Sequence, residues 1–521
     1  MEIRQNRGRL MWASFLTLIA AGMGFAVRGG ILRNWGDQFG FTQSELGTIT
    51  GGGLVGFGAV ILGASLITDR LGYKTILLFA FVLHLLSVVV TLAATPIYEA
   101  AGKEATFFCL YVGMFMFAIA NGLCETAINP LIANVYPEKK THYLNILHAG
   151  WPGGLILGGL LAKALVGNVR WEIPIALYAI PSLWYGFIVF KEAFPESDTT
   201  KAGLSYGEML KEFASPILLL LLLLQACVGY VELGTDSWIS NITDSILTGQ
   251  GLYLFIYAAS IMFVLRFFAG PIVERINPLG LLCASTVLGT TGLLMLGSFK
   301  TAAMMWLAVS IYGLGKTFLW PTMLGVVGER FPRGGAITMG AVGAAGALSA
   351  GLLGGPGIGY KQDYNATAQL KAEAPATYER YAAPAGNQFL FFPKVKGMDG
   401  AKVGVLLESN DDGWAPASTL NSDYEIASGR KDEKVPEVLA ELKTWWDETG
   451  EPNKDTDQEP IQEARIYGGQ MALKLTAAVP AAMFVGYLIL VMYFKSQGGY
   501  KTVEIGGEES GATVDDSGNS S

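Results

Sequence analysis

Twelve long apolar stretches separated by short polar turns constrain this chain more than any other feature of its sequence. A helix needs roughly 20 mainly apolar residues to cross a bilayer. Only helices and closed barrels satisfy their backbone groups inside lipid, so we expect a polytopic all-α membrane protein. The predicted spans are residues 10–33, 46–68, 75–95, 106–136, 141–166, 171–190, 214–240, 250–274, 278–298, 302–329, 334–358 and 468–494.

Charge is scarce and unevenly placed. Only 15% of the residues are charged, below the ~25% of soluble domains, which argues against a disordered chain or a nucleic-acid binder. Between Lys361 and Arg465 lie 20 acidic and 12 basic side chains, which account for the whole net charge of −8. The membrane body is therefore neutral, and the four cysteines and three histidines show no metal-ligand spacing.

The short loops predict the orientation. Fifteen Lys and Arg residues lie on the side of the N-terminus and five on the other, so the positive-inside rule makes both termini cytoplasmic. We expect a protein of a bacterial-type inner membrane. The predicted parts are a first six-helix bundle (1–190), a cytoplasmic linker (191–213), a second bundle (214–358 and 468–494), an extracytoplasmic insert (359–467) and a cytoplasmic tail (495–521).

The insert and the tail are the polar parts of the chain. The insert, which we call the cap (359–467), has a helix-like start (365–383), a hairpin-like stretch (389–408) and a helical end. A small folded domain and a stack of extended helix ends both fit this pattern. The tail is rich in glycine, serine and acidic residues and has no apolar periodicity, which predicts disorder.

An internal repeat divides the membrane body. The acid–arginine pair Asp69-Arg70 follows the second span and recurs as Glu274-Arg275 after the eighth, at an offset of 205. The fourth and tenth spans match at an offset of 191, which aligns Glu125 with Lys316. Repeated matches in the same order predict two six-helix halves related by pseudo-symmetry.

The turn after the second span resembles the signature of the major facilitator superfamily, an acid–base–glycine–base pattern. The matching residues are Asp69, Arg70, Gly72 and Lys74. Ser65 and Tyr73 depart from that signature. The resemblance implies two six-helix bundles that rock about a central cavity lined mainly by the first, fourth, seventh and tenth spans.

Within that superfamily the chain is similar to the fucose/glucose:proton symporter branch. The residues that carry this likeness are Asn121, Gly122, Glu125, Asn129, Pro130, Leu144, Asn145, His148 and Ala149, together with the stretch from Gly229 to Glu232. This likeness implies proton-coupled uptake of a sugar.

Four charges fall inside the spans that the resemblance places around the cavity: Arg28, Glu125, Glu232 and Lys316. Inserting a charged side chain near the bilayer centre costs at least ~2.5–3.5 kcal/mol, so we expect a functional or structural role for each of them. The repeat predicts that Glu125 and Lys316 face each other. A carboxylate that takes up a proton could couple substrate binding to proton movement, whereas the alternative is ion pairs that only fix the packing.

Further residues complete the predicted sites. Around the cavity we expect hydrogen bonds from Asn129, Asn145 and His148, a stacking face from Trp320, and Asp236 at the mouth. We expect a cytoplasmic gate whose salt bridges hold one end shut in one state. Its predicted members are Asp69, Arg70, Gly72, Arg266, Glu274 and Arg275.

These patterns predict a secondary active transporter, most simply a proton-coupled sugar symporter. One alternative is uptake of an organic anion held by Arg28 and Lys316; another is a non-transporting receptor whose cap binds a ligand. Gly51, Gly52 and Gly53 lack the ending of a phosphate-binding loop, and no nucleophile–base set occurs, so no enzyme or cofactor is expected. The expected partners are a sugar or small organic acid, a coupling proton or sodium ion, and the bilayer, with a monomeric chain and no nucleic acid.

Overall fold

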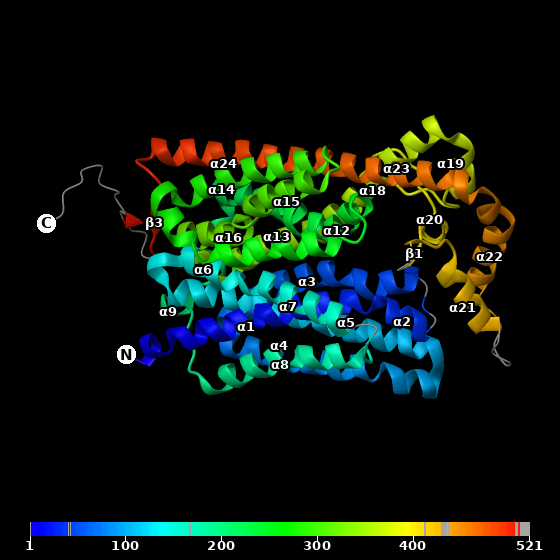
Figure 1. Ribbon diagram of the computed structural model, residues 1–521. Helices are drawn as coiled ribbons and strands as arrows, with labels where there is room; N and C mark the ends of the chain where they lie inside the picture. The colour runs from blue at the N-terminus through cyan, green and yellow to red at the C-terminus, as the bar shows by residue number, and fades with distance from the viewer. Residues whose placement is uncertain are drawn as a thin grey trace.

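The computed structural model describes residues 2–39, 41, 43–165, 168–410, 413–428, 435, 437–505 and 509–510. Long helices lie side by side in two groups (Figure 1). The first group, the N-half, contains α1 (Glu2–Gly30), α2 (Leu32–Phe39), α3 (Gln43–Leu71), α4 (Tyr73–Leu92), α5 (Ala94–Val135), η1 (Pro137–Lys139), α6 (Lys140–His148), α7 (Gly150–Leu165) and α8 (Glu172–Lys191).

A linker with three short helices leads to the second group, the C-half. The linker helices are α9 (Asp198–Lys201), α10 (Tyr206–Lys211) and η2 (Glu212–Ala214). The C-half contains α11 (Pro216–Gly229), η3 (Tyr230–Gly234), α12 (Thr235–Ile246), α13 (Gly251–Arg266), α14 (Ala269–Leu296), α15 (Ala302–Lys316), α16 (Leu319–Arg330), η4 (Pro332–Gly334), α17 (Gly335–Ser349), η5 (Ala350–Gly354), α18 (Gly355–Glu373), α23 (Glu451–Thr476) and α24 (Ala478–Ser496).

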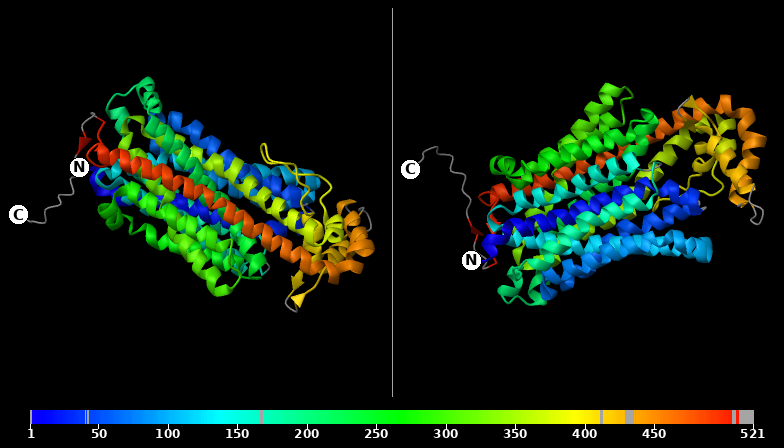
Figure 2. Two further views of the ribbon diagram at one scale, coloured as in Figure 1. Left: turned by 90° about the horizontal axis from the view of Figure 1, so that it is seen from above. Right: turned by 60° about the horizontal axis from the view of Figure 1, so that its bottom comes forward.

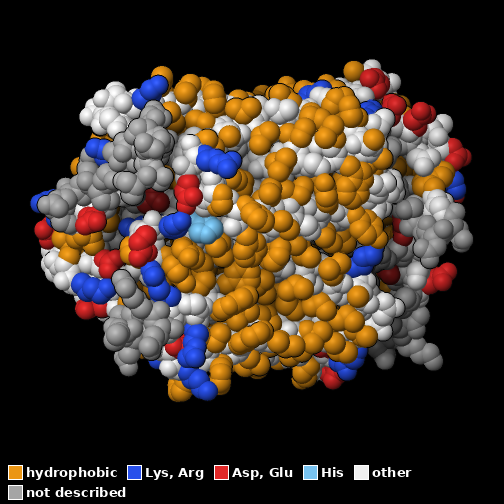
Figure 3. Space-filling view, turned by 60° about the vertical axis from the view of Figure 1, so that its left-hand side comes forward, with side chains coloured by type: hydrophobic (Ala, Val, Ile, Leu, Met, Phe, Trp, Pro, Cys, Tyr) orange, Lys and Arg blue, Asp and Glu red, His pale blue; other side chains and the backbone are white. Residues whose placement is uncertain are grey.

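Each predicted span lies mainly on helical residues within the described part of the chain. Among the described residues, ten helices are long and apolar enough to cross a membrane, and Gly251–Arg266 is a shorter apolar helix. Figure 3 shows a broad apolar band between two charged ends, as expected for a surface that faces lipid. The end where α1 begins and α24 ends is called the terminal face below, and the opposite end, beside α19 to α22, the cap face (Figure 1).

Helices pack mainly within their own half. In the N-half α1 packs on α7 and α8, and α5 packs on α3 and α4; in the C-half α14 packs on α15 and α24, and α11 on α17. The two halves meet through α3 with α17, α6 with α16, and α7 with α13. Buried residues of both halves belong to one apolar core, which positions the charged residues between them.

The cap has a core of its own and also rests on extended helix ends, so the two alternatives for this segment combine. Its elements are α19 (Pro375–Tyr381), α20 (Gly400–Leu406), β1 (Ser409–Asn410), β2 (Gly413–Trp414), α21 (Ser418–Ser428), α22 (Glu437–Trp445) and η6 (Trp446–Gly450). Its buried core includes Tyr381, Leu406 and Trp446, and α18 and α23 run from the bundle into it (Figure 2). The hairpin prediction is wrong over Gly400–Leu406, which is helical because the Asp399 side chain accepts hydrogen bonds from the first turn.

The tail prediction also needs correction. Disorder was expected from residue 495, but α24 continues to Ser496 and β3 (Thr502–Val503) pairs with β4 (Glu509–Ser510). Tyr500 packs against the core of the bundle. Residues 506–508 and 511–521 lie outside the described residues.

Candidate functional site

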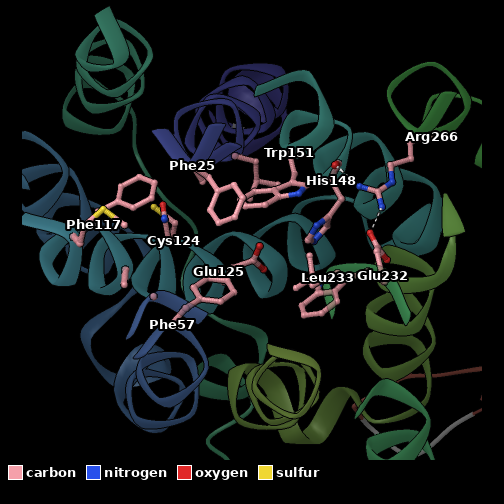
Figure 4. A pocket seen from close by; sticks show the side chains of 17 residues that line it. Phe25, Phe57, Phe117, Cys124, Glu125, His148, Trp151, Glu232, Leu233 and Arg266 are labelled. Atoms are coloured by element: carbon pink, nitrogen blue, oxygen red, sulfur yellow. Dashed lines mark hydrogen bonds and ion pairs between the residues drawn. The ribbon is translucent and has the colours of Figure 1, made fainter. Parts of the chain in front are cut away.

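A central cavity of about 260 Å³ lies between the two halves. Its wall is mainly aromatic and aliphatic, with a few polar groups that converge on it, as in most small-molecule sites (Figure 4). The lining residues are Leu18, Ala21, Phe25, Gly53, Phe57, Met114, Phe117, Ala118, Asn121, Cys124, Glu125, His148, Trp151, Glu232, Leu233, Arg266 and Trp320.

The aromatic side chains come from both halves. Phe25 and Trp151 lie on one side of Glu125 and Phe57 lies on the other (Figure 4). Trp320 reaches the cavity from α16 because Gly346 of α17 leaves room for it: a Cβ at that glycine would lie 2.6 Å from the indole ring. The carboxylate of Glu125 is thus surrounded by ring faces and edges that could pack against a small solute.

Glu125 is held by a neutral amide. Its Oε2 accepts a hydrogen bond of 2.7 Å from Asn129 Nδ2, which also donates to the Glu125 carbonyl at 3.0 Å. Asn129 Oδ1 then faces His148 Nε2 at 2.9 Å, so His148 donates from Nε2. Among the residues that the structure describes, no Lys or Arg forms an ion pair with Glu125.

Glu232 is held by a charge. It lies in η3, where one extra residue per turn interrupts the helix between α11 and α12. Its Oε1 accepts 3.0 Å from Arg266 Nη2, and both side chains are almost fully buried. Arg266 also donates to the carbonyls of Thr317 at 2.8 Å and of His148 at 2.6 Å, the second across the two halves. Hydrogen bonds therefore run from Glu125 through Asn129 and His148 to Arg266 and Glu232.

Arg266 was predicted in the cytoplasmic gate, and that placement is wrong. The side chain is 1% exposed and points into the central cavity (Figure 4). Its position at the end of α13 suggests a loop, but the guanidinium turns inward, where two backbone carbonyls and the carboxylate of Glu232 compensate its burial.

Lys316 does not face Glu125 as the repeat predicted. Its Nζ instead pairs with Asp236 of α12, and its ammonium lies 5.3 Å from the centre of the Tyr312 ring. Neither Lys316 nor Asp236 lines the cavity. Because both partners belong to the C-half, the pair neutralises itself within one bundle.

Arg28 lies behind the cavity wall. Its Nη2 donates to Ser87 at 2.7 Å and its Nη1 to the Gly24 carbonyl at 3.2 Å. The guanidinium carbon lies 4.1 Å from the centre of the Phe117 ring, and Phe117 lines the cavity. In the described part of the chain Arg28 has no carboxylate partner, so aromatic faces and neutral oxygens balance its burial.

The remaining predicted residues lie toward the terminal face. Asn145 does not line the cavity; it donates to the Thr141 carbonyl at 2.8 Å and to Thr322 of the other half at 3.2 Å. Asp69 Oδ2 accepts 3.2 Å from the Ala336 amide, which joins α3 to α17.

Other members of the predicted gate differ in what they contact. Glu274 pairs with Lys139 of the other half at 2.7 Å on the exposed surface. Arg70 lies 4.1 Å from the ring centre of Tyr206 in the linker, and Arg275 is exposed. Gly72 has φ of +81°, a backbone conformation that glycine adopts without strain, and it separates α3 from α4.

Sequence reasoning missed one buried polar group near the cavity. His84 of α4 lies between Tyr185, at 2.8 Å, and Asn121, at 2.9 Å, and Asn121 lines the cavity. A histidine in an otherwise apolar span was the available signal, since ionisable residues in spans are rarely without a role. Within the described residues, no three His, Cys, Asp or Glu side chains gather closely enough to hold a metal ion.

Comparisons with known proteins agree with this architecture. The structure of the Escherichia coli fucose:proton symporter FucP (N162A) aligns over 70% of this chain and 93% of its own, with a TM-score of 0.56 and 17% identity. The human organic anion transporter MFSD10 aligns over 71% of this chain and 95% of its own, with a TM-score of 0.52 and 16% identity. At these identities the likeness concerns the fold.

A curated relative gives a partial sequence match. The gallate transporter of Pseudomonas putida is 29% identical over 181 residues, which cover 33% of this chain and 37% of that protein. The profile of the Major Facilitator Superfamily matches residues 14–354, well over half of the chain. With the twin helical halves around one central cavity, this match shows that the chain belongs to the Major Facilitator Superfamily of membrane transporters.

Proposed function

We propose that this transporter carries a small polar solute, a sugar in the first instance, by proton symport through the central cavity. The observation that carries the proposal is the state of Glu125. It lines the cavity, its carboxylate is held by the neutral amide of Asn129, and Arg266 is already paired with Glu232. Protonation of Glu125 would therefore remove a charge without breaking an ion pair.

The hydrogen-bonded chain offers a route for coupling. A protonated Glu125 has a donor in place of an acceptor, which changes its bond to Asn129 and, through it, the position of His148. The His148 carbonyl accepts from Arg266 across the two halves. Proton uptake could thus alter the contact between the halves, which alternating access requires.

The cavity wall favours a sugar-sized solute. Trp151 and Trp320 offer aromatic faces for the apolar face of a sugar ring, while Asn121 could bond a hydroxyl group. The orientation with both termini in the cytoplasm and the cap outside, and the inner membrane as the location, remain part of this proposal.

Transport in proteoliposomes tests the proposal. A panel of monosaccharides and organic acids is screened by counterflow, which needs no net proton movement, and hits are then tested for accumulation driven by a proton gradient. Glu125→Gln should keep counterflow and lose accumulation. Glu104→Gln, an exposed acid on the same helix α5, is the matched control and should keep both. Equal loss of both activities in Glu125→Gln would make Glu125 a substrate ligand instead of the proton carrier.

A second candidate is uptake of an organic anion, and Arg28 is the observation that favours it. This guanidinium has no carboxylate partner among the described residues and is separated from the cavity by Phe117. The partial match to a gallate transporter points to the same class of solute. On this reading, counterflow should respond to aromatic or aliphatic acids and not to sugars, and Arg28→Met should abolish it.

A further inference from the structure

The segment that follows the last helix folds back onto the terminal face. Gly498 and Gly499 have φ of +88° and +105°, so they reverse the chain at the end of α24. The next side chain, Tyr500, packs edge-on against Phe494 with ring centres 5.5 Å apart. Residues Gly499–Ile505, called the latch segment here, therefore lie against the bundle and do not continue away along the axis of α24.

One carboxylate joins the latch segment to both halves. The Tyr500 hydroxyl donates 2.7 Å to Oε2 of Glu329, which lies on α16 in the C-half and is 7% exposed. The other oxygen of Glu329 accepts 2.6 Å from the Thr141 hydroxyl and 3.3 Å from the Thr141 amide, on α6 in the N-half. Tyr500 thus fixes the orientation in which Glu329 bonds the opposite half.

The rest of the latch segment lines a cavity that residues of both halves also line. Residues Thr502–Ile505 form one wall of a cavity of about 570 Å³ at the terminal face. The same cavity is lined by N-half residues, among them Asp69, Tyr73 and Lys140. The C-half anchors the segment: Arg330 donates 2.6 Å to the Lys501 carbonyl, and Arg333 lies 3.5 Å from the Ile505 carbonyl.

These contacts have a consequence for opening of the terminal face. For α6 and α16 to separate, the bonds from Thr141 to Glu329 must break, and Tyr500 of the latch segment orients the carboxylate that makes them. We propose that residues Gly499–Ile505 act as a built-in latch that stabilises the state closed at the terminal face. The latch acts on the conformational equilibrium and is independent of the identity of the solute.

A thiol-accessibility measurement tests the latch. Ala133 is 6% exposed, lines the same cavity from the end of α5, and accepts a cysteine with little change in size. In full-length protein with Cys109, Cys124, Cys227 and Cys283 replaced, Ala133→Cys is reacted in detergent with a polar maleimide, so that both faces are accessible. The rate of labelling reports how often the terminal face opens.

Two variants weaken the latch to different degrees. Tyr500→Phe removes only the hydroxyl that orients Glu329, and it should raise the labelling rate by roughly threefold, the effect of one hydrogen bond. Ending the chain at Gly498 removes the whole latch segment and should raise the rate by roughly tenfold or more. Tyr493→Phe is the matched control, since Tyr493 is 45% exposed on α24.

Equal labelling rates in the parent, Tyr500→Phe and the shortened chain would overturn the latch. A rise in Tyr493→Phe as large as that in Tyr500→Phe would also overturn it, since the effect would then not depend on Glu329. Because Tyr500→Phe deletes a single atom, the test remains valid if the shortened chain fails to fold. Thr141→Val should also raise the labelling rate, because it removes the hydroxyl bond by which the N-half holds Glu329.

Discussion

The two halves of this transporter share a fold but neutralise their buried charges differently. Near the cavity, two acids of the C-half each meet a base: Glu232 pairs with Arg266, and Asp236 pairs with Lys316. At the terminal face Glu329 of the same half is bound by hydroxyl groups instead. In the N-half Arg28 and Glu125 are both buried, yet the structure gives each only neutral or aromatic partners among the described residues.

This difference distinguishes the half in which the charges of the buried groups should stay constant from the half in which one of them can change. A buried ion pair resists any change of charge in either partner, because the remaining charge would be left uncompensated. A carboxylate held by an amide can gain a proton without that penalty. On the proposed function, a proton-linked change of charge is therefore expected in the N-half, at Glu125, while the ion pairs of the C-half keep their charges.

The largest expected effect comes from breaking a C-half pair. Lys316→Met leaves the Asp236 carboxylate, 13% exposed, without its base. Removal of one partner of a buried pair costs ~3–5 kcal/mol. We expect a loss of unfolding free energy of that size, measured by chemical denaturation of the purified protein in detergent.

A double variant supplies the control. Asp236→Asn added to Lys316→Met removes both charges and should recover most of the lost stability, because no uncompensated charge remains. If the losses of unfolding free energy in Lys316→Met and Asp236→Asn simply add in the double variant, the two residues do not interact. The claim that the C-half holds its charges as ion pairs would then be wrong.

The same substitution in both halves tests the comparison directly. Glu232→Gln leaves Arg266 with three carbonyl and amide acceptors but no carboxylate and should cost about 2–3 kcal/mol. Glu125→Gln keeps an oxygen that can accept from Asn129 and should cost about 1 kcal/mol or less. Both are measured by denaturation; equal losses in the two variants would remove the distinction between the halves.

Much of the fold followed from the sequence because its causes are local. Span length, apolar composition and the repeated acid–arginine pair depend on residues that are close together in the chain, and each predicted span lies mainly on helical residues among those described. The latch segment was mistaken for a disordered tail because its order comes from distant partners: Glu329, Arg330 and Arg333 hold a glycine-rich stretch that has no periodicity of its own.

The site was harder to predict because pairing depends on helix rotation. The sequence identified Arg28, Glu125, Glu232 and Lys316 as intramembrane charges, but it paired Glu125 with Lys316. The wide turn of η3 adds a residue and rotates everything after it by about 100° relative to a regular helix. Asp236 follows that turn and pairs with Lys316.

At the terminal face, weakening the partly buried contact of Asp69 should have a moderate effect on how often that face opens. Asp69→Asn keeps the size of the side chain but weakens the bond that its carboxylate accepts from the Ala336 amide across the halves. Solute binding should be unchanged, while labelling of Ala133→Cys rises by about two- to fivefold and transport slows. Loss of solute binding in proportion to transport would mean that Asp69 supports the structure as a whole.

The smallest effect is expected at the exposed pair of the same face. Lys139 and Glu274 join the halves at 2.7 Å, but both side chains are more than half exposed. Water and salt screen such pairs, so Glu274→Gln should change labelling of Ala133→Cys by about twofold or less, and only at low ionic strength. Labelling rates at low and high salt, compared between parent and variant, measure this. An effect as large as that of Asp69→Asn that persists at high salt would show that the surface pair, and not the buried carboxylate, sets the closure of the terminal face.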